Sequence, residues 1–190
     1  AINFAKSVHA DQKRESQEPY YIHPEAVALI LLDMDMDADT VIAGLLHDTV
    51  EDGHDITVEK IAQMFGKDIA RMVDGVTKLT QIKFSNVEDR QAENLRKMLL
   101  AMSQDVRVMI IKLCDRLHNM RTGDAWPEQK RRDKALETME VYAPIAHRLG
   151  ISNIKEELED RSLHYLDPVG YETIRDLLNK HGDEFLHQVC

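Results

Sequence analysis

The sequence predicts an all-helical (all-α) bundle of about nine or ten helices. Apolar residues recur at helical spacing along most of the 190 residues. No segment shows the alternation of apolar and polar residues that is typical of a half-buried strand, and there is no glycine-rich phosphate loop or internal repeat. Prolines and glycines stand mainly between the periodic segments, where helices begin and end.

The helix boundaries follow from capping residues and from apolar spacing. Pro24 suits a first helical turn, Thr57 can cap a short helix, and Gly66 ends that helix. Pro144 should kink a long helix that Gly150 ends. In chain order, the expected helices span residues 1–13, 25–33, 37–52, 57–65, 68–79, 86–103, 106–122, 127–149, 151–166 and 168–180.

The composition is that of a folded globular protein, with 43% hydrophobic and 31% charged residues. We expect neither a membrane span nor a signal peptide, because the apolar stretches are short. The net charge of −10 argues against nucleic-acid binding but permits an anionic small molecule. Cys114 and Cys190 lie too far apart for a zinc–thiolate motif, which favours a reducing, cytoplasmic setting.

One stretch combines a buried helix with ionisable residues. The apolar run Ile42–Leu46 leads into His47 and Asp48, and Glu51 and Asp52 follow one turn later. Burying such groups costs several kcal/mol, roughly, unless partners or a metal ion compensate. In a continuous helix, His47 would share a face with Glu51, and Asp48 with Asp52. The alternative is a capped helix end with a solvated acidic tip.

A second apolar run, Val106–Leu113, also enters a polar cluster. Asp115, Asn119 and Thr122 follow at positions i, i+4 and i+7, which place them on one helical face. Two buried helices with polar ends could therefore meet at one site. His23 stands at the start of another expected helix and is by itself most often a packing or capping residue.

Two imidazoles and two carboxylates would together make a mixed nitrogen and oxygen ligand set. His23, His47, Asp48 and Asp115 are these residues. Such a set suits Mn²⁺, Fe²⁺ or Zn²⁺ better than Ca²⁺. An ion of this kind would offset the two carboxylate charges and acidify a water molecule in an open position.

The order of these residues in a helical chain resembles the HD-domain metal phosphohydrolases, and five motifs narrow the resemblance to the N-terminal hydrolase domain of the Rel/SpoT family. Those enzymes make and degrade the alarmones (p)ppGpp of the bacterial stringent response. The motifs are, in order, Tyr20–Pro24, Ala43–Asp52, Val73–Leu79, Asp115–Thr122 and Tyr142–Gly150. The match covers nearly the whole chain, so the resemblance implies an HD-domain helical bundle.

The resemblance implies a 3′-pyrophosphohydrolase that cleaves (p)ppGpp to GDP or GTP and pyrophosphate, with one Mn²⁺ ion. It implies Mn²⁺ ligation by His23, His47, Asp48 and Asp115, water activation by Glu51 and Asp52, and nucleotide contacts from Arg14, Ser16, Asn119 and Thr122. It also implies a hydrolase domain over residues 1–154 and, over 155–190, a helical connector towards an absent synthetase domain. Since residue 1 is Ala, we expect a piece of a longer protein.

One position departs from the family pattern. The loop runs Lys13-Arg14-Glu15-Ser16, with an acid where the family commonly has a second basic residue. Lys13 or Lys83 could supply the missing cation, or the pyrophosphate could bind more weakly.

Two other functions stay open on the residues alone. An HD phosphohydrolase for a different nucleotide would share the metal ligands but not the Arg14–Ser16 loop or the Asn119–Thr122 face. A non-catalytic regulatory module would use the same polar residues in buried ion pairs, for example Asp115 with Arg148.

Overall fold

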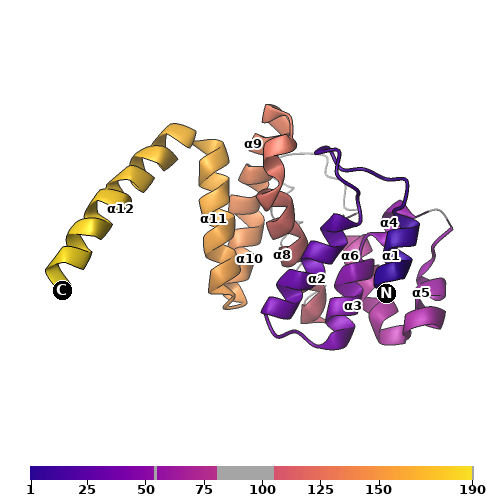
Figure 1. The fold of residues 1–190 in the computed structure, drawn as a ribbon. Coiled ribbons are helices and arrows are strands. Elements are labelled where there is room, and N and C mark those ends of the chain that lie inside the picture. The colour runs from indigo at the N-terminus through magenta and orange to yellow at the C-terminus, as the bar shows by residue number, and fades with distance from the viewer. Residues whose placement is uncertain (54, 81–104, 190) are drawn as a thin grey trace. The chain divides into compact units, whose positions relative to one another are not determined.

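The computed structural model describes residues 1–53, 55–80 and 105–189 (Figure 1). Its regular elements are helices, with one isolated β-bridge between Lys13 and Pro19. The expected helix 86–103 and Lys83 lie outside the described residues. The helices are α1 (Ile2–Val8), α2 (Ile22–Asp33), α3 (Ala38–Leu46), α4 (Thr49–Asp52), α5 (Val58–Phe65), α6 (Lys67–Thr80), α8 (Val106–Arg121), α9 (Glu128–Glu137), α10 (Ala143–Arg148), α11 (Ser152–Leu166) and α12 (Pro168–Val189).

The all-helical fold class is therefore confirmed, and most of the expected helices are found. Those expected over 25–33, 57–65, 68–79, 106–122, 151–166 and 168–180 correspond to α2, α5, α6, α8, α11 and α12. Within the described ranges, no helix has the length and apolar character needed to span a membrane.

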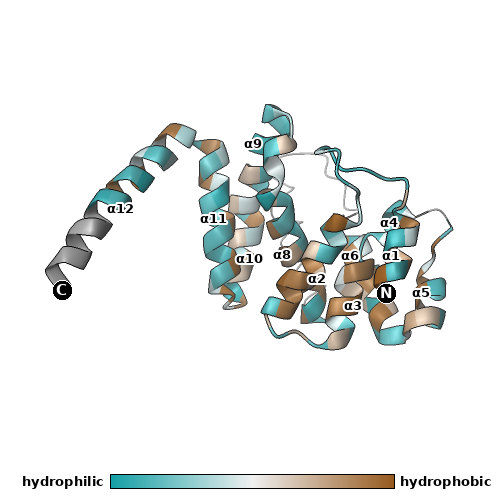
Figure 2. Ribbon diagram, viewed as in Figure 1, coloured by the Kyte–Doolittle hydropathy of each residue, from teal (hydrophilic) through white to brown (hydrophobic). Residues whose placement is uncertain are grey.

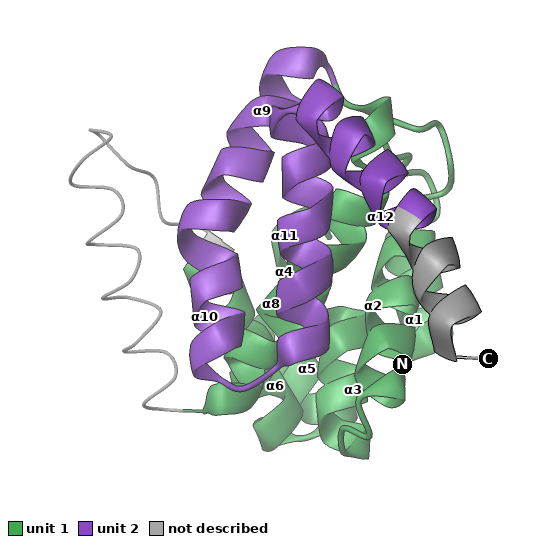
Figure 3. Ribbon diagram, turned by 90° about the vertical axis from the view of Figure 1, so that its left-hand side faces the viewer, with its two compact units in different colours: residues 1–126 green, residues 127–190 purple. Residues whose placement is uncertain are grey.

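The chain divides into two compact units, Ala1–Trp126 and Pro127–Cys190 (Figure 3). The expected functional boundary at residue 154 falls inside α11 of the second unit. This division concerns packing alone, so the assignment of residues 1–154 and 155–190 to two functions stays a prediction.

The core of the first unit is formed by α2, α3, α6 and α8, which pack against one another. Hydrophobic residues gather on these helices in Figure 2. Gly44 lets α3 approach α2 closely, since a Cβ atom there would collide with the Cδ1 atom of Leu31. The fully buried side chains of this core include Leu31, Leu46, Met72, Met109, Ile111 and Leu113. The polar ends of α2, α3 and α8 are held together by this core.

The prediction of one helix over 1–13 is wrong beyond Val8, where α1 ends. The next residues fold back on the chain instead of continuing the helix. Tyr20 donates its backbone N–H to the Gln12 carbonyl at 3.0 Å, and Lys13 pairs with Pro19. Residues 12–20 therefore form a small closed loop.

The prediction of one continuous helix over 37–52 is also wrong, because the backbone turns at His47 and Asp48 between α3 and α4. Side chains satisfy the carbonyls at the end of α3. His47 Nδ1 bonds the Gly44 carbonyl at 2.7 Å, and the Thr49 hydroxyl donates to the Leu46 carbonyl at 2.6 Å. Asp48 and Asp52 stay one helical turn apart, joined by the bond from Asp52 N–H to the Asp48 carbonyl at 2.9 Å.

The expected helix 127–149 corresponds to α9 and α10, and the kink expected at Pro144 stays a prediction. A π-helical turn, Thr138–Tyr142, joins α9 to α10. Proline lacks the N–H that would bond back to the preceding turn. The wider turn lies directly before Pro144, at the start of α10.

Candidate metal centre and its polar surroundings

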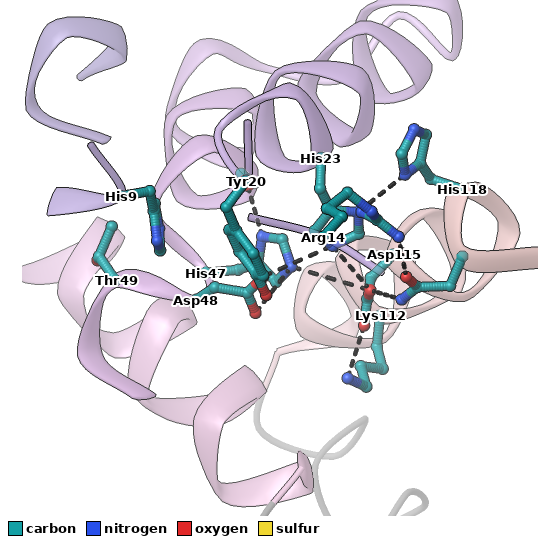
Figure 4. A network of polar contacts seen from close by, with 12 residues as sticks. His9, Arg14, Tyr20, His23, His47, Asp48, Thr49, Lys112, Asp115 and His118 are labelled. Carbon is teal, nitrogen blue, oxygen red and sulfur yellow. Dashed lines mark hydrogen bonds and ion pairs between the residues drawn. The ribbon is translucent and has the colours of Figure 1, made fainter. Parts of the chain in front are cut away.

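Four side chains of the first unit converge on one point (Figure 4). His23 Nε2 lies 3.2 Å from Asp115 Oδ1 and 3.5 Å from Asp48 Oδ2. His47 Nε2 lies 3.1 Å from Asp48 Oδ1 and 4.0 Å from Asp115 Oδ1. Each of the four residues expected to bind a metal ion thus turns a ligand atom to the same place.

The sequence brings these side chains together through three helix ends. His23 stands in the first turn of α2, where Pro24 fits without a lost hydrogen bond. His47 and Asp48 occupy the turn between α3 and α4, where both residues keep right-handed helical torsion angles. Asp115 lies on α8, which packs against both α2 and α3.

The other ring nitrogen, Nδ1, of both His23 and His47 also lies within hydrogen-bond distance of a neighbour. His47 Nδ1 donates to the Gly44 carbonyl at 2.7 Å, and because a carbonyl only accepts, the Nε2 atom of His47 carries a lone pair when the ring is neutral. His23 Nδ1 lies 2.8 Å from His118 Nδ1, a contact between two buried rings.

The two carboxylates are held in a similar way. The Tyr20 hydroxyl donates to Asp48 Oδ2 at 3.0 Å, while Asp48 Oδ1 faces His47. Lys112 Nζ lies 2.6 Å from Asp115 Oδ2, and Asn119 Nδ2 donates to Asp115 Oδ1 at 2.6 Å. Outer partners of this kind orient ligands and are typical of metal centres.

These residues fit a divalent ion. His47 Nε2 is buried and has no hydrogen-bond partner within the described part of the chain. A buried nitrogen without a partner is costly and calls for an explanation such as an ion. Ligand atoms of His23, His47 and Asp48 all lie within 4.8 Å of one another. A set of two nitrogen and two oxygen donors suits a first-row transition ion.

The surroundings of Asp115 and His118 favour the protonation states that suit a metal centre. Burial alone would raise the pKa of Asp115, but the nearby Lys112 ammonium opposes it, and the pKa lies well below its usual range. Burial lowers the pKa of His118 to about 3, and the neighbouring His23 and Arg14 add to this. Asp115 is therefore a carboxylate and His118 a neutral ring near pH 7.

Glu51 and Asp52 lie on α4 beside this centre, with exposed side chains. Loss of hydration around the carboxyl group, together with repulsion from Asp48, raises the pKa of Glu51. The same two causes raise the pKa of Asp52, although a hydrogen bond with Tyr20 partly opposes them. The centre therefore concentrates negative charge that a cation would relieve.

The structure brings together three of the four residues expected to contact a nucleotide. Arg14 Nη2 donates to Asn119 Oδ1 at 2.9 Å and to Thr122 Oγ1 at 3.1 Å. The Ser16 hydroxyl instead donates to Glu18 of its own loop at 2.9 Å, in an exposed position. Since Asn119 also bonds Asp115, the Arg14 cluster adjoins the metal ligands directly.

Three of the ligands are held by residues for which no role was predicted from the sequence, namely Tyr20, Lys112 and His118. Lys112 and His118 lie three residues before and after Asp115, so helical spacing alone could have placed them on its face. Tyr20 gave no such signal, because its contact with Asp48 depends on the closed loop before α2.

Comparison with known proteins agrees with this arrangement. The HD domain family matches residues 1–152, most of the chain. The chain belongs to the HD-domain family. The resemblance to Rel/SpoT hydrolase domains, inferred from the five motifs, is confirmed by curated relatives that align over nearly the whole chain. A divalent metal site is what the HD domain and its His/Asp cluster imply.

Several relatives are about half identical to this HD domain. One is a guanosine-3′,5′-bis(diphosphate) 3′-pyrophosphohydrolase of Aquifex aeolicus, 49% identical over 99% of the chain and 27% of the relative. Another is the bifunctional (p)ppGpp synthase/hydrolase SpoT of Escherichia coli K12, 49% identical over 92% of the chain and 25% of the relative. The chain thus spans about a quarter of the length of these relatives.

A solved structure resembles the HD domain over almost its full length. It is described as a metazoan ortholog of SpoT that hydrolyzes ppGpp and plays a role in starvation responses. The two share 26% identity and a TM-score of 0.60, over 90% of this chain and 92% of the other. This likeness confirms the HD-type helical fold.

Proposed function

We propose that this HD domain hydrolyses the 3′-pyrophosphate of (p)ppGpp, giving GDP or GTP and pyrophosphate, with Mn²⁺ as its ion. The observation that carries the proposal is the convergence of His23, His47, Asp48 and Asp115 beside the Arg14 cluster. The names of relatives that share about half of the residues supply the substrate.

The four converging side chains would hold the ion, with the His47 Nε2 atom as its buried nitrogen ligand. A divalent ion at such a site supplies positive charge against the phosphates and lowers the pKa of water. Lys112 keeps one oxygen of Asp115 occupied, so that the other faces the centre.

Glu51 is proposed as the general base. Its raised pKa makes it a better proton acceptor than an ordinary surface carboxylate. Asp52 would position Glu51 or the attacking water, and its backbone carbonyl is fixed by a bond from Gln12 at 2.8 Å. A well-placed base contributes about 10²–10⁴-fold to the rate.

Arg14 is proposed to bind a substrate phosphate. Its Nη2 group is held by Asn119 and Thr122, while its Nε and Nη1 groups make no hydrogen bond to the described residues. These remaining N–H groups form the planar fork that suits phosphate. Ser16, which bonds Glu18 here, would have to turn to contact the nucleotide.

We also propose that this chain is part of a longer protein. Residues 155–190 would connect the hydrolase domain to a synthetase domain in a longer cytoplasmic protein. The share of about a quarter of each relative, one of them named as a bifunctional synthase/hydrolase, is consistent with this.

The two rival functions make different demands on the site. A module stabilised by buried ion pairs accounts for Lys112 with Asp115, but it gives no reason for His47 Nε2, which lies 3.1 Å from Asp48 Oδ1 without forming a hydrogen bond. A hydrolase of another nucleotide would have the same metal centre, so only its choice of substrate distinguishes it from a (p)ppGpp hydrolase.

The test compares ppGpp, pppGpp, GTP and dGTP as substrates of the EDTA-stripped domain, before and after Mn²⁺ is added. We expect pyrophosphate release from ppGpp and pppGpp alone, and only with the ion. Cleavage of GTP or dGTP at a similar rate would favour a general nucleotide phosphohydrolase. No cleavage of any nucleotide by protein that binds Mn²⁺ would refute the proposal.

A further inference from the structure

Among the described residues, the contact between His23 and His118 is the one outer contact of the centre that joins two groups able either to donate or to accept. Their Nδ1 atoms lie 2.8 Å apart, and the residues are only 2% and 8% exposed. We propose that His118 is a positioning residue for the metal centre, whose Nδ1 atom accepts the Nδ1 proton of His23. This inference rests on the proposed function, since it supposes a divalent ion at His23.

The short distance permits only one proton between the two rings. If the proton lies on His23 Nδ1, the Nε2 atom of a neutral His23 has a lone pair, and it faces Asp48 and Asp115. If the proton lies on His118 Nδ1, a neutral His23 carries its own proton on Nε2, which then points into the centre and blocks an ion. The tautomer of His118 therefore decides whether His23 can act as a ligand.

His47 provides the contrast within the same site. Its Nδ1 proton is donated to a backbone carbonyl, which cannot donate in return, so its tautomer is fixed by the fold. The Nδ1 proton of His23 instead depends on a side chain, His118, as its acceptor. A substitution of His118 can thus change the affinity for the ion without touching a ligand.

Helix α8 contributes to two of the proposed metal ligands: it carries Asp115, and its His118 contacts His23. Asp115 and His118 are three residues apart on α8. Asp115 faces the Nε2 side of the His23 ring, where the ion would lie, and His118 contacts its Nδ1 side (Figure 4). Thr122 bonds the His118 carbonyl at 3.0 Å and accepts from Arg14. His118 therefore lies between the metal ligands and Arg14, the proposed phosphate contact.

The test uses two amides that imitate different atoms of the ring. His118→Asn can place its side-chain oxygen near the position of Nδ1, and so keeps an acceptor for His23. His118→Gln is equally polar but extends its amide towards the position of Nε2. His118→Leu removes the acceptor altogether. The ring of His164 on α11, which contacts Tyr165 and Tyr171, provides the matched control His164→Leu.

The main measurement is the Kd for Mn²⁺ alone, by titration calorimetry of EDTA-stripped protein. We expect His118→Asn to bind Mn²⁺ within about threefold of the parent, and His118→Gln and His118→Leu to bind it about 10- to 100-fold more weakly. His164→Leu should bind Mn²⁺ as the parent does. The melting temperature of each stripped protein reports separately on folding.

Parent-like Mn²⁺ affinity in His118→Leu would overturn the inference, and so would equal losses in His118→Asn and His118→Gln. If His118→Leu fails to fold, the comparison between the two amides decides the question. Because no nucleotide is present, the result is independent of the substrate. A parent protein that binds Mn²⁺ but leaves ppGpp intact would contradict the proposed function only, whereas one that binds no Mn²⁺ would overturn this inference.

Discussion

Lys112 offers the sharpest test of the electrostatics of the centre, through the substitution Lys112→Met. The Lys112 and Asp115 side chains are only 12% and 8% exposed, and their charged atoms lie 2.6 Å apart. Methionine keeps much of the apolar stem but leaves the buried carboxylate without its cation. We expect the ion-free protein to lose stability at neutral pH.

The magnitude follows from the distance and the burial. At an effective dielectric constant of about 20, unit charges at this separation attract by about 6 kcal/mol. Desolvation of the two ions offsets part of this, and removing one partner of a buried pair typically costs about 3–5 kcal/mol. Since His23 and Asn119 still contact Asp115, we expect a loss of about 3 kcal/mol in the free energy of unfolding.

The loss should depend on pH in a defined direction. The pKa of Asp115 is lowered on folding, so its contribution to stability is present above the pKa of the unfolded chain and is lost as the pH falls through the folded value. In Lys112→Met, burial meets less opposition, so the folded pKa of Asp115 should be higher than in the parent. The difference between the two proteins should therefore be largest near pH 7 and shrink once the pH falls below the raised pKa of the variant.

The assay is urea unfolding of EDTA-stripped protein, followed by the fluorescence of Trp126, the single tryptophan. Lys134→Met is the matched control, because Lys134 and Glu137 form a pair with the same i,i+3 spacing at 3.1 Å but with 42% and 32% exposure. That variant should lose no more than about 0.5 kcal/mol. Equal losses in the two variants, or a loss in Lys112→Met that does not change with pH, would refute the reasoning.

The remaining predictions concern the proposed catalytic and phosphate-binding residues, with Mn²⁺ content and ppGpp turnover measured side by side. Glu51→Gln should keep the ion and lose about 10²-fold or more in turnover, whereas Asp48→Asn should lose the ion and the activity together; loss of the ion in Glu51→Gln would make Glu51 a ligand. Arg14→Ala should lower kcat/KM without loss of Mn²⁺, and unchanged kinetics would place the phosphates elsewhere. Glu15→Lys should tighten substrate binding, because it replaces a repulsive charge by an attractive one; unchanged or weaker binding would show that this position does not face the phosphates.

The sequence alone determined most of the helices and the positions where polar groups enter the core. The run Ile42–Leu46 indicated a buried helix ending in His47 and Asp48, and α3 ends there. The spacing of Asp115, Asn119 and Thr122 placed them on one face of α8, and Asn119 does bond Asp115. Such features are local, since apolar periodicity and capping residues act within a few turns.

Local patterns could not show how the backbone behaves at the centre of the site. Residues 37–52 were predicted to form one continuous helix, yet the helix breaks at His47 and Asp48, where side chains satisfy the carbonyls of Gly44 and Leu46. Such bonds compete with the helix without changing its apolar pattern.

Only the tertiary structure decided which residues support the ligands. His23 and His118 are 95 residues apart, and Arg14 and Asn119 are 105 apart, yet both pairs are within hydrogen-bond distance. Their meeting depends on the close approach of α2 and α3 at Gly44 and on the packing of α8 against both helices. Such packing sums many small contacts from across the chain, so no single segment carries the information that brings His118 to His23 and Tyr20 to Asp48.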